Sequence, residues 1–172
     1  VAQIQKAETL RALHHGDKPL VLPNAWDAGT AVMVAAAGFP AVATTSAGVA
    51  FAMGYPDGEV IGRDGMLAAV AAIADRVPVP VTADMEAGYG DKPEDVAETV
   101  RQTIAAGAVG LNLEDGIDHA VGSMYDLPLA VERIAAAREA ANSAGVPIVI
   151  NGRTDVYFSP NLDDAAKFDE AV

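Results

Sequence analysis

Two acidic residues in segment 83–90 have the spacing of a metal site. Asp84 and Glu86 lie two residues apart at the expected end of a strand, so both side chains should point to one face. Two carboxylates on one buried face repel each other and raise each other's pKa unless a cation lies between them. Carboxylate oxygens suit Mg²⁺, and also Mn²⁺. Taken alone, the same pair could equally be two solvated acids in a strand-to-helix loop.

The end of the next expected strand adds a third carboxylate, Glu114. Neighbouring strands lie about 4.8 Å apart, so this side chain could share a water-filled metal sphere with Asp84 and Glu86. We therefore predict that the three carboxylates converge within one coordination shell, counting bridging waters.

Arg153 ends the following strand, and its planar guanidinium can hold a substrate carboxylate through two parallel hydrogen bonds. The alternative for this residue is a structural salt bridge to Asp155 or Glu114. Upstream, segment 44–48 offers hydroxyl groups and backbone N–H groups, which suit a carboxylate or an oxyanion.

The segment 116–124 starts beside this proposed metal site. It has a glycine near each end, Gly116 and Gly122, where the backbone can hinge. Few large apolar side chains are present to hold it closed, so we predict a lid over the site. His119 in this segment, and Tyr89 in the preceding loop, are candidate proton donors.

Strands and helices are expected to alternate along the chain. Short apolar runs rich in Val or Ile are typical of parallel strands buried on both faces, and they lie at 20–24, 41–46, 79–85, 109–114 and 147–153. Helices are expected between them at 28–37, 63–75, 92–106 and 127–144, and a further helix begins near Asn161. Asp91 and Glu94 resemble a capping box at the start of the third of these helices.

Such an alternation gives a parallel sheet, which could close as a barrel or stay open and doubly wound. Polar residues follow all five strands, namely Asn24, Ser46, Asp84, Glu114 and Arg153. A barrel collects site residues from several strand ends, so the pattern favours an α/β fold of the parallel (β/α)8 TIM type. Because such a barrel needs about 250 residues, we expect 1–172 to be a single barrel domain truncated after about five βα units, with its C-terminal part missing.

The composition narrows the classes of partner. The chain carries 24 acidic and 11 basic residues, a formal charge of −13. Such a surface repels nucleic acid and anionic membranes, so neither is expected as a partner. No apolar run approaches the ~18–20 residues of a membrane span, and a cytoplasmic enzyme is the default expectation. Because the sequence has no cysteine, a thiolate metal site and a cysteine nucleophile are excluded.

Six segments together resemble the isocitrate lyase/phosphoenolpyruvate mutase superfamily and keep its order along nearly the whole chain. They are 22–27, 44–48, 54–57, 83–90, 112–115 and 151–155. The resemblance implies a (β/α)8 barrel whose members often exchange a C-terminal helix between subunits, and hence a homo-oligomer, either a dimer or a tetramer. It also implies cleavage or formation of C–C or P–C bonds in small 2-oxo or 2-hydroxy carboxylates through Mg²⁺-stabilised enolates.

The resemblance assigns a role to each matching acidic residue. Asp84 matches the main metal-site aspartate, and Glu86 stands where a second aspartate usually reaches the metal through water. Glu114 and Asp57 match the other outer-sphere acids.

The substrate-binding residues follow from the same resemblance. Arg153 matches the arginine that holds the substrate carboxylate, and 46–48 matches a segment that binds it through a serine hydroxyl and backbone N–H groups. The expected substrate contacts are therefore Asn24, Trp26, Ser46, Ala47, Gly48 and Arg153, and the expected catalytic residues are Asp57, Tyr89, His119 and Arg153.

The sequence also departs from the family. The lyases carry a loop with a catalytic cysteine, which is missing here, and the mutases carry a Lys and an Asn in the segment corresponding to 116–124, which has neither. Decarboxylation of an oxaloacetate-like acid would need only the metal, Arg153 and the segment around Ser46. The alternatives are a mutase or hydrolase acting on the P–C bond of phosphonopyruvate or carboxyphosphonoenolpyruvate, and a catalytically silent metabolite-binding barrel.

Overall fold

The computed structural model describes residues 2–118 and 121–172. Five strands form one parallel sheet: β1 (Asn24–Ala25), β2 (Val42–Thr44), β3 (Val81–Asp84), β4 (Gly110–Glu114) and β7 (Val149–Arg153). Four of the five predicted strands are confirmed within shorter bounds. The first is shifted, because β1 shares only Asn24 with the predicted run 20–24 and continues to Ala25. The sheet order β1-β2-β3-β4-β7 follows the chain without a reversal. An open doubly wound sheet reverses its order at a switch point, so the described strands have the order of a barrel.

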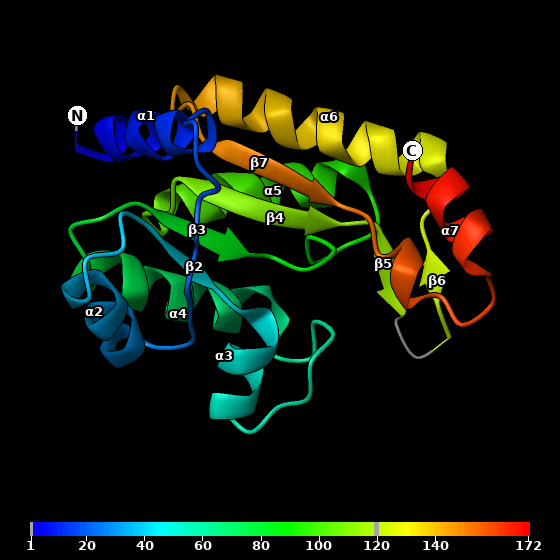
Figure 1. Ribbon diagram of the computed structural model, residues 1–172, viewed down its shortest axis with the longest axis horizontal. Coiled ribbons are helices and arrows are strands. Elements are labelled where there is room, and N and C mark those ends of the chain that lie inside the picture. The colour runs from blue at the N-terminus through cyan, green and yellow to red at the C-terminus, as the bar shows by residue number, and fades with distance from the viewer. Residues whose placement is uncertain (1, 119–120) are drawn as a thin grey trace.

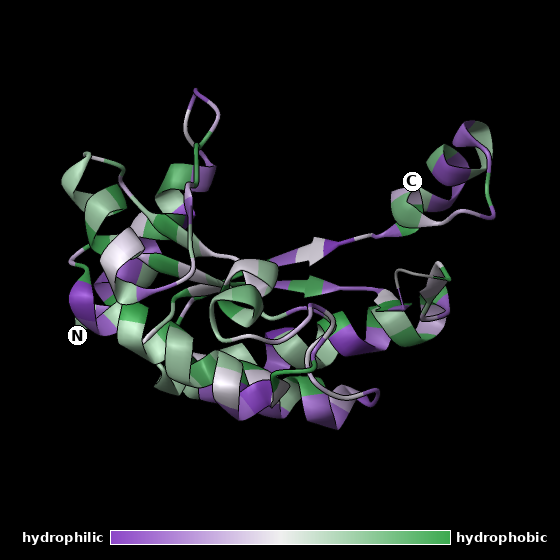
Figure 2. Ribbon diagram, turned by 90° about the horizontal axis from the view of Figure 1, so that it is seen from below, coloured by the Kyte–Doolittle hydropathy of each residue, from purple (hydrophilic) through white to green (hydrophobic). Residues whose placement is uncertain are grey.

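Four helices connect these strands and cover one face of the sheet: α2 (Ala28–Ala36), α4 (Gly62–Arg76), α5 (Pro93–Ala105) and α6 (Leu127–Ala144) (Figure 1). They are the four predicted helices, with ends shifted by one residue at most. The main core lies between helices and sheet, where Leu111 and Leu113 of β4 pack with Met66, Val96 and other buried side chains. Seen from below, the helix layer lies along one side and the C-terminal segment with α7 (Asp164–Ala171) extends away from it (Figure 2).

The start of α5 differs from the expected capping box of Asp91 and Glu94. Lys92 is the N-cap and Pro93 is the first helical residue. The carboxylate of Asp95 accepts a hydrogen bond from the Lys92 N–H at 3.2 Å. The prediction was wrong by one residue because a proline at the first helical position fixes the helix start one residue later.

Four short elements were missed: α3 (Ser46–Ala52), the 3-10 turn η1 (Val156–Phe158), and the antiparallel strands β5 (Gly116–Asp118) and β6 (Ser123–Met124). The segment 116–124, which we expected to be a loop, therefore contains two paired strands, and its closure over the site stays a prediction. Asn161 donates a hydrogen bond to the Val121 carbonyl at 3.2 Å, which ties the far side of this hairpin to the chain before α7. Within the described residues, no helix is long and apolar enough to cross a membrane.

The N-terminal ends of the strands are closed by α1 (Ala2–His14). Leu10 is fully buried and packs with Ala41 and Val109, which precede β2 and β4. A Cβ on Gly110 would lie 2.8 Å from a Leu10 methyl group, so glycine is required where this helix approaches the sheet. Gln3 fixes the helix by donating to the Ile104 carbonyl at 2.7 Å.

We expect Leu10→Ala to lower the free energy of unfolding by about 2–5 kcal/mol, because it opens a cavity where α1 closes the sheet. The matched control is Leu127→Ala in α6, where the side chain is 70% exposed and the cost should be about 0.5 kcal/mol or less. Urea denaturation of both variants measures the difference. An equal loss in the free energy of unfolding for the two variants would show that the packing of Leu10 between α1 and the sheet does not stabilise the fold.

Candidate active site

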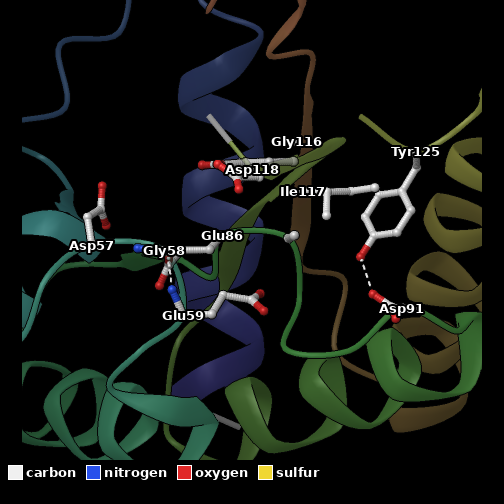
Figure 3. A pocket seen from close by; sticks show the side chains of 11 residues that line it. Asp57, Gly58, Glu59, Glu86, Asp91, Gly116, Ile117, Asp118 and Tyr125 are labelled. Carbon is white, nitrogen blue, oxygen red and sulfur yellow. Dashed lines mark hydrogen bonds between the residues drawn. The ribbon is translucent and has the colours of Figure 1, made fainter. Parts of the chain in front are cut away.

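A cavity of ≈ 560 Å³ opens beside the C-terminal ends of β3 and β4. Its wall carries six carboxylates, Asp57, Glu59, Glu86, Asp91, Glu114 and Asp118, together with Tyr125 and Ile117 (Figure 3). In a barrel, this end of the sheet is where side chains of several strands converge. The cavity is therefore the candidate active site, and its chemistry is dominated by negative charge.

Asp84 is the last residue of β3 and is almost fully buried. Its Oδ2 accepts hydrogen bonds from the Ser46 N–H at 3.0 Å and the Ser46 hydroxyl at 2.9 Å, while its own N–H donates to the Thr44 hydroxyl at 2.8 Å. Its Oδ1 is buried and has no hydrogen-bond partner among the described residues. A buried carboxylate oxygen without a donor is costly in an apolar setting, so this oxygen is suited to a bound cation.

Glu114 and Arg153 lie directly opposite each other on β4 and β7. Arg153 Nη2 is 2.6 Å from Glu114 Oε2, and Arg153 Nε is 2.8 Å from Asp155 Oδ1. The salt bridges that we gave as the alternative for Arg153 are thus both present. Burial, and then the charge of Asp84, raise the pKa of Glu114 to about 9, although the neighbouring guanidinium offsets part of this shift.

Glu86 follows β3 and its side chain turns toward the segment before α4. Its Oε2 accepts from the backbone N–H groups of Gly58 at 3.1 Å and Glu59 at 2.7 Å (Figure 3). Its Oε1 accepts from the Tyr89 hydroxyl at 2.7 Å. Burial raises the pKa of Glu86, as do the charges of Asp57 and Asp84, and the hydrogen bonds oppose this shift. Both oxygens of Glu86 are therefore held by protein donors.

The three predicted metal ligands lie near one another but face different partners. Asp84 faces Ser46, Glu86 faces 58–59, and Glu114 faces Arg153. In the part of the chain that the structure describes, no three His, Cys, Asp or Glu side chains are grouped as direct metal ligands. A shared sphere that includes bridging waters stays a prediction.

The remaining predicted residues are more dispersed. Asp57 lines the cavity. The Tyr89 hydroxyl donates a hydrogen bond to Glu86, and burial raises the pKa of Tyr89. Asn24 and Trp26 lie at the end of β1, and Trp26 is 44% exposed. His119 lies outside the described residues.

The segment expected to bind a carboxylate, Ser46 to Gly48, forms the first turn of α3. The Ser46 N–H and hydroxyl are directed at Asp84, and the Gly48 N–H donates to the Thr45 hydroxyl at 3.3 Å. A Cβ on Gly48 would lie 3.1 Å from the Trp26 Cβ, so the glycine allows Trp26 to pack closely on this turn. Ala47 lies between them and is half-buried.

Sequence reasoning missed Arg133, which lies in α6 and is fully buried. Its guanidinium donates to the carbonyls of Ala87, Gly90 and Asp91 in the loop after β3. It also lies 3.9 Å from the centre of the Tyr125 ring, and the Tyr125 hydroxyl donates to Asp91 at 2.8 Å (Figure 3). The available signal was its position four residues before Ala137, on the buried stripe of a helix where a charge needs a partner.

Comparisons with known proteins agree with the geometry. Residues 10–172 match the family model for phosphoenolpyruvate phosphomutase. The chain belongs to this family, within the isocitrate lyase/PEP mutase superfamily. It is 31% identical to 2,3-dimethylmalate lyase, a PEP mutase/isocitrate lyase superfamily member, whose crystal structure superposes with a TM-score of 0.82 over 96% of this chain and 59% of that one.

Two further relatives show the range of names in the superfamily. A “putative phosphonomutase” from Burkholderia cenocepacia J2315 is 47% identical, with a TM-score of 0.90 over 96% of this chain and 67% of that chain. The 2-methylisocitrate lyase of Escherichia coli (strain K12) is 30% identical over 168 residues, or 92% of this chain and 55% of that protein. The chain thus spans about half the length of the curated relatives it matches.

For this superfamily member we predict a pH-dependent stability that originates at Glu114. Between about 4.5, the ordinary pKa of a glutamate, and about 9, the unfolded chain loses the Glu114 proton while the folded protein keeps it. The unfolded state binds fewer protons in this window, so the free energy of unfolding should fall as the pH rises.

Glu114→Gln removes this titration, so in EDTA the stability of the wild type relative to the variant should decline from pH 5 to pH 9. Urea denaturation at several pH values measures the difference, and Glu94→Gln at an exposed position is the control. A difference that grows with pH would show that Glu114 is ionised and stabilised by Arg153.

Proposed function

We propose that the protein is a Mg²⁺-dependent lyase that cleaves or decarboxylates a small 2-oxo or 2-hydroxy carboxylate through an enolate. The observation that carries the proposal is the buried Oδ1 of Asp84, which has no donor among the described residues while Oδ2 is fixed by Ser46. Family membership supports the reaction class, since its relatives include 2,3-dimethylmalate lyase.

The donor set fits a hard divalent cation. Asp84 at the end of β3 would hold the metal directly, and Glu114 and Asp57, which line the cavity, would act at longer range, because all three supply carboxylate oxygens. Mg²⁺, or Mn²⁺ in its place, would supply Lewis-acid polarisation of the substrate 2-oxo oxygen. Burial, and then the charge of Asp84, raise the pKa of Glu114, and the positive charge of a bound cation would oppose both effects.

Arg153 is the residue that would orient the substrate. Its guanidinium has five N–H donors, and the bonds to Glu114 and Asp155 use Nε and Nη2. The two carboxylates hold the guanidinium plane at the C-terminal end of β7, where Arg153 lines a second cavity that shares Glu114 with the first. A guanidinium held in this way is preorganised for a bidentate contact to a substrate carboxylate. Proton delivery by Tyr89 or His119 stays a prediction.

A second candidate is P–C bond chemistry on a phosphonopyruvate-like substrate. The 47% identity to the Burkholderia cenocepacia protein favours it. We also propose a homo-oligomer, either a dimer or a tetramer, and a small-molecule carboxylate as the substrate.

One set of assays separates these functions. The chain is incubated with Mg²⁺ and with 2-oxo diacids, 2-hydroxy diacids or phosphonates. The release of pyruvate, CO₂ or phosphate is followed, and phosphorus NMR detects isomerisation of a phosphonate to an enol phosphate, which releases none of these products. A lyase should also exchange the methyl protons of pyruvate with deuterium when Mg²⁺ is present. Failure of every substrate together with absence of exchange would leave only a metabolite-binding role.

Asp84→Asn should weaken Mg²⁺ binding by tenfold or more, because even outer partners of metal ligands contribute on the order of 10–100-fold. Asparagine keeps an oxygen that can accept from Ser46, so the fold should survive. Calorimetric titration with Mg²⁺ tests the change, and urea denaturation controls for folding. Unchanged Mg²⁺ affinity would contradict the assignment of Asp84.

Arg153→Lys should lower kcat/KM on the order of 10–100-fold, because lysine keeps the charge but cannot form the bidentate contact. The melting temperature should change little by comparison. A variant with a lower melting temperature but full kcat/KM would show that Arg153 has only a structural role, through its salt bridges to Glu114 and Asp155.

A further inference from the structure

Left-handed backbone is concentrated at one place beside the cavity. Among the described residues, Glu59, Glu86 and Tyr89 are the non-glycine residues with positive φ, at 65°, 50° and 58°. This conformation is disfavoured for side chains of this size, and it persists only where surrounding contacts over-determine it. The three residues come from two segments 27 residues or more apart in the chain, so a tertiary interaction must hold them.

The contacts that hold them form one closed network. Glu86 accepts from the backbone N–H groups of Gly58 and Glu59 and from the Tyr89 hydroxyl. The Glu59 carboxylate in turn accepts from the Tyr89 N–H at 2.6 Å. Each of the three left-handed residues is therefore bound to the other two, and Glu86 is the member with the most bonds.

The length of the Glu86 side chain matters for this network. An aspartate at this position would be one methylene shorter and could not keep all three hydrogen bonds from the same backbone position. With Glu86 in place, segment 57–59 is held against the loop after β3, and Asp57, Gly58 and Glu59 become part of the cavity wall (Figure 3).

We propose that Glu86 is a positioning residue that fixes segment 57–59 as a wall of the cavity, in place of acting as a metal ligand. The statement that Glu86 is not a metal ligand rests on the proposed function. The hydrogen bonds from the Gly58 and Glu59 N–H groups to Glu86, here called the tether, can be tested in the metal-free protein. Because the tether carries Asp57 to the cavity, Glu86 acts on the substrate site through this segment.

The test compares Glu86→Ala, Glu86→Asp and Glu86→Gln in the full chain. Glutamine keeps the length and an acceptor oxygen, so it should keep the tether. Amide hydrogen exchange without metal, read by NMR at Gly58 and Glu59 and corrected for intrinsic rates, should accelerate by about tenfold or more in Glu86→Ala and Glu86→Asp, because each amide loses a charge-assisted bond. In Glu86→Gln both amides should stay close to wild-type protection.

Calorimetry with Mg²⁺ supplies the second readout, with Asp84→Asn as the matched comparison. Glu86→Gln should keep Mg²⁺ affinity within about threefold, the scale of one weak surface charge interaction, while Asp84→Asn loses far more and leaves Gly58 and Glu59 protected. A loss in Glu86→Gln as large as that in Asp84→Asn would overturn the proposal, and so would unchanged exchange in Glu86→Ala. Should the wild type bind no Mg²⁺, the proposed function fails, and the exchange experiment still decides the tether.

Discussion

The structure depends on how several carboxylates can be buried at one end of a parallel sheet. Asp84, Glu86, Glu114 and Asp155 are 9%, 6%, 6% and 2% exposed. Burying ionised carboxylates without donors is too costly for a marginally stable domain, so each must be neutralised, paired or hydrogen-bonded. Asp84 uses Ser46, Glu86 uses the 58–59 backbone and Tyr89, and Arg153 serves both Glu114 and Asp155.

This constraint explains why the loops around the cavity are bound so closely to one another. Arg133 in α6 donates hydrogen bonds to carbonyls of the loop after β3, and Glu86 on that loop accepts hydrogen bonds from segment 58–59. Gly88 allows the loop to pass, because its φ is 97° and a Cβ there would lie 2.9 Å from Leu113. A charge on an outer helix therefore contributes to the shape of a site that its own side chain does not enter.

The two ends of the sheet have different tasks. At the N-terminal end, α1 packs Leu10 over Gly110 and is held by apolar contacts and by the hydrogen bond from Gln3. At the C-terminal end, β3, β4 and β7 present Asp84, Glu114 and Arg153. Between the two ends of the sheet, Asn112 of β4 lies opposite Asn151 of β7, and a 2.9 Å hydrogen bond joins their side chains. Such a division lets stability and chemistry vary separately, which is characteristic of barrels.

The sequence by itself determined the strands, the four connecting helices and the strand ends at which polar residues gather, because apolar runs and glycines after helices are local signals. Gly38, Gly107 and Gly145, which follow α2, α5 and α6, adopt positive φ. The sequence also identified Asp84, Glu114 and Arg153 as neighbours, since parallel strands bring their ends to one edge.

Only the tertiary structure decided which partner each of these side chains faces. The bonds between Glu86 and 58–59 and between Arg133 and 87–91 join residues 27 to 46 positions apart, and no local sequence pattern predicts such a pairing. The same holds for α3 and the β5–β6 pair, whose few residues are too short for a periodic signal. A buried carboxylate accepts hydrogen bonds from the donors that tertiary packing places beside it. The identity of those donors is therefore determined by the packing and cannot be predicted from the local sequence.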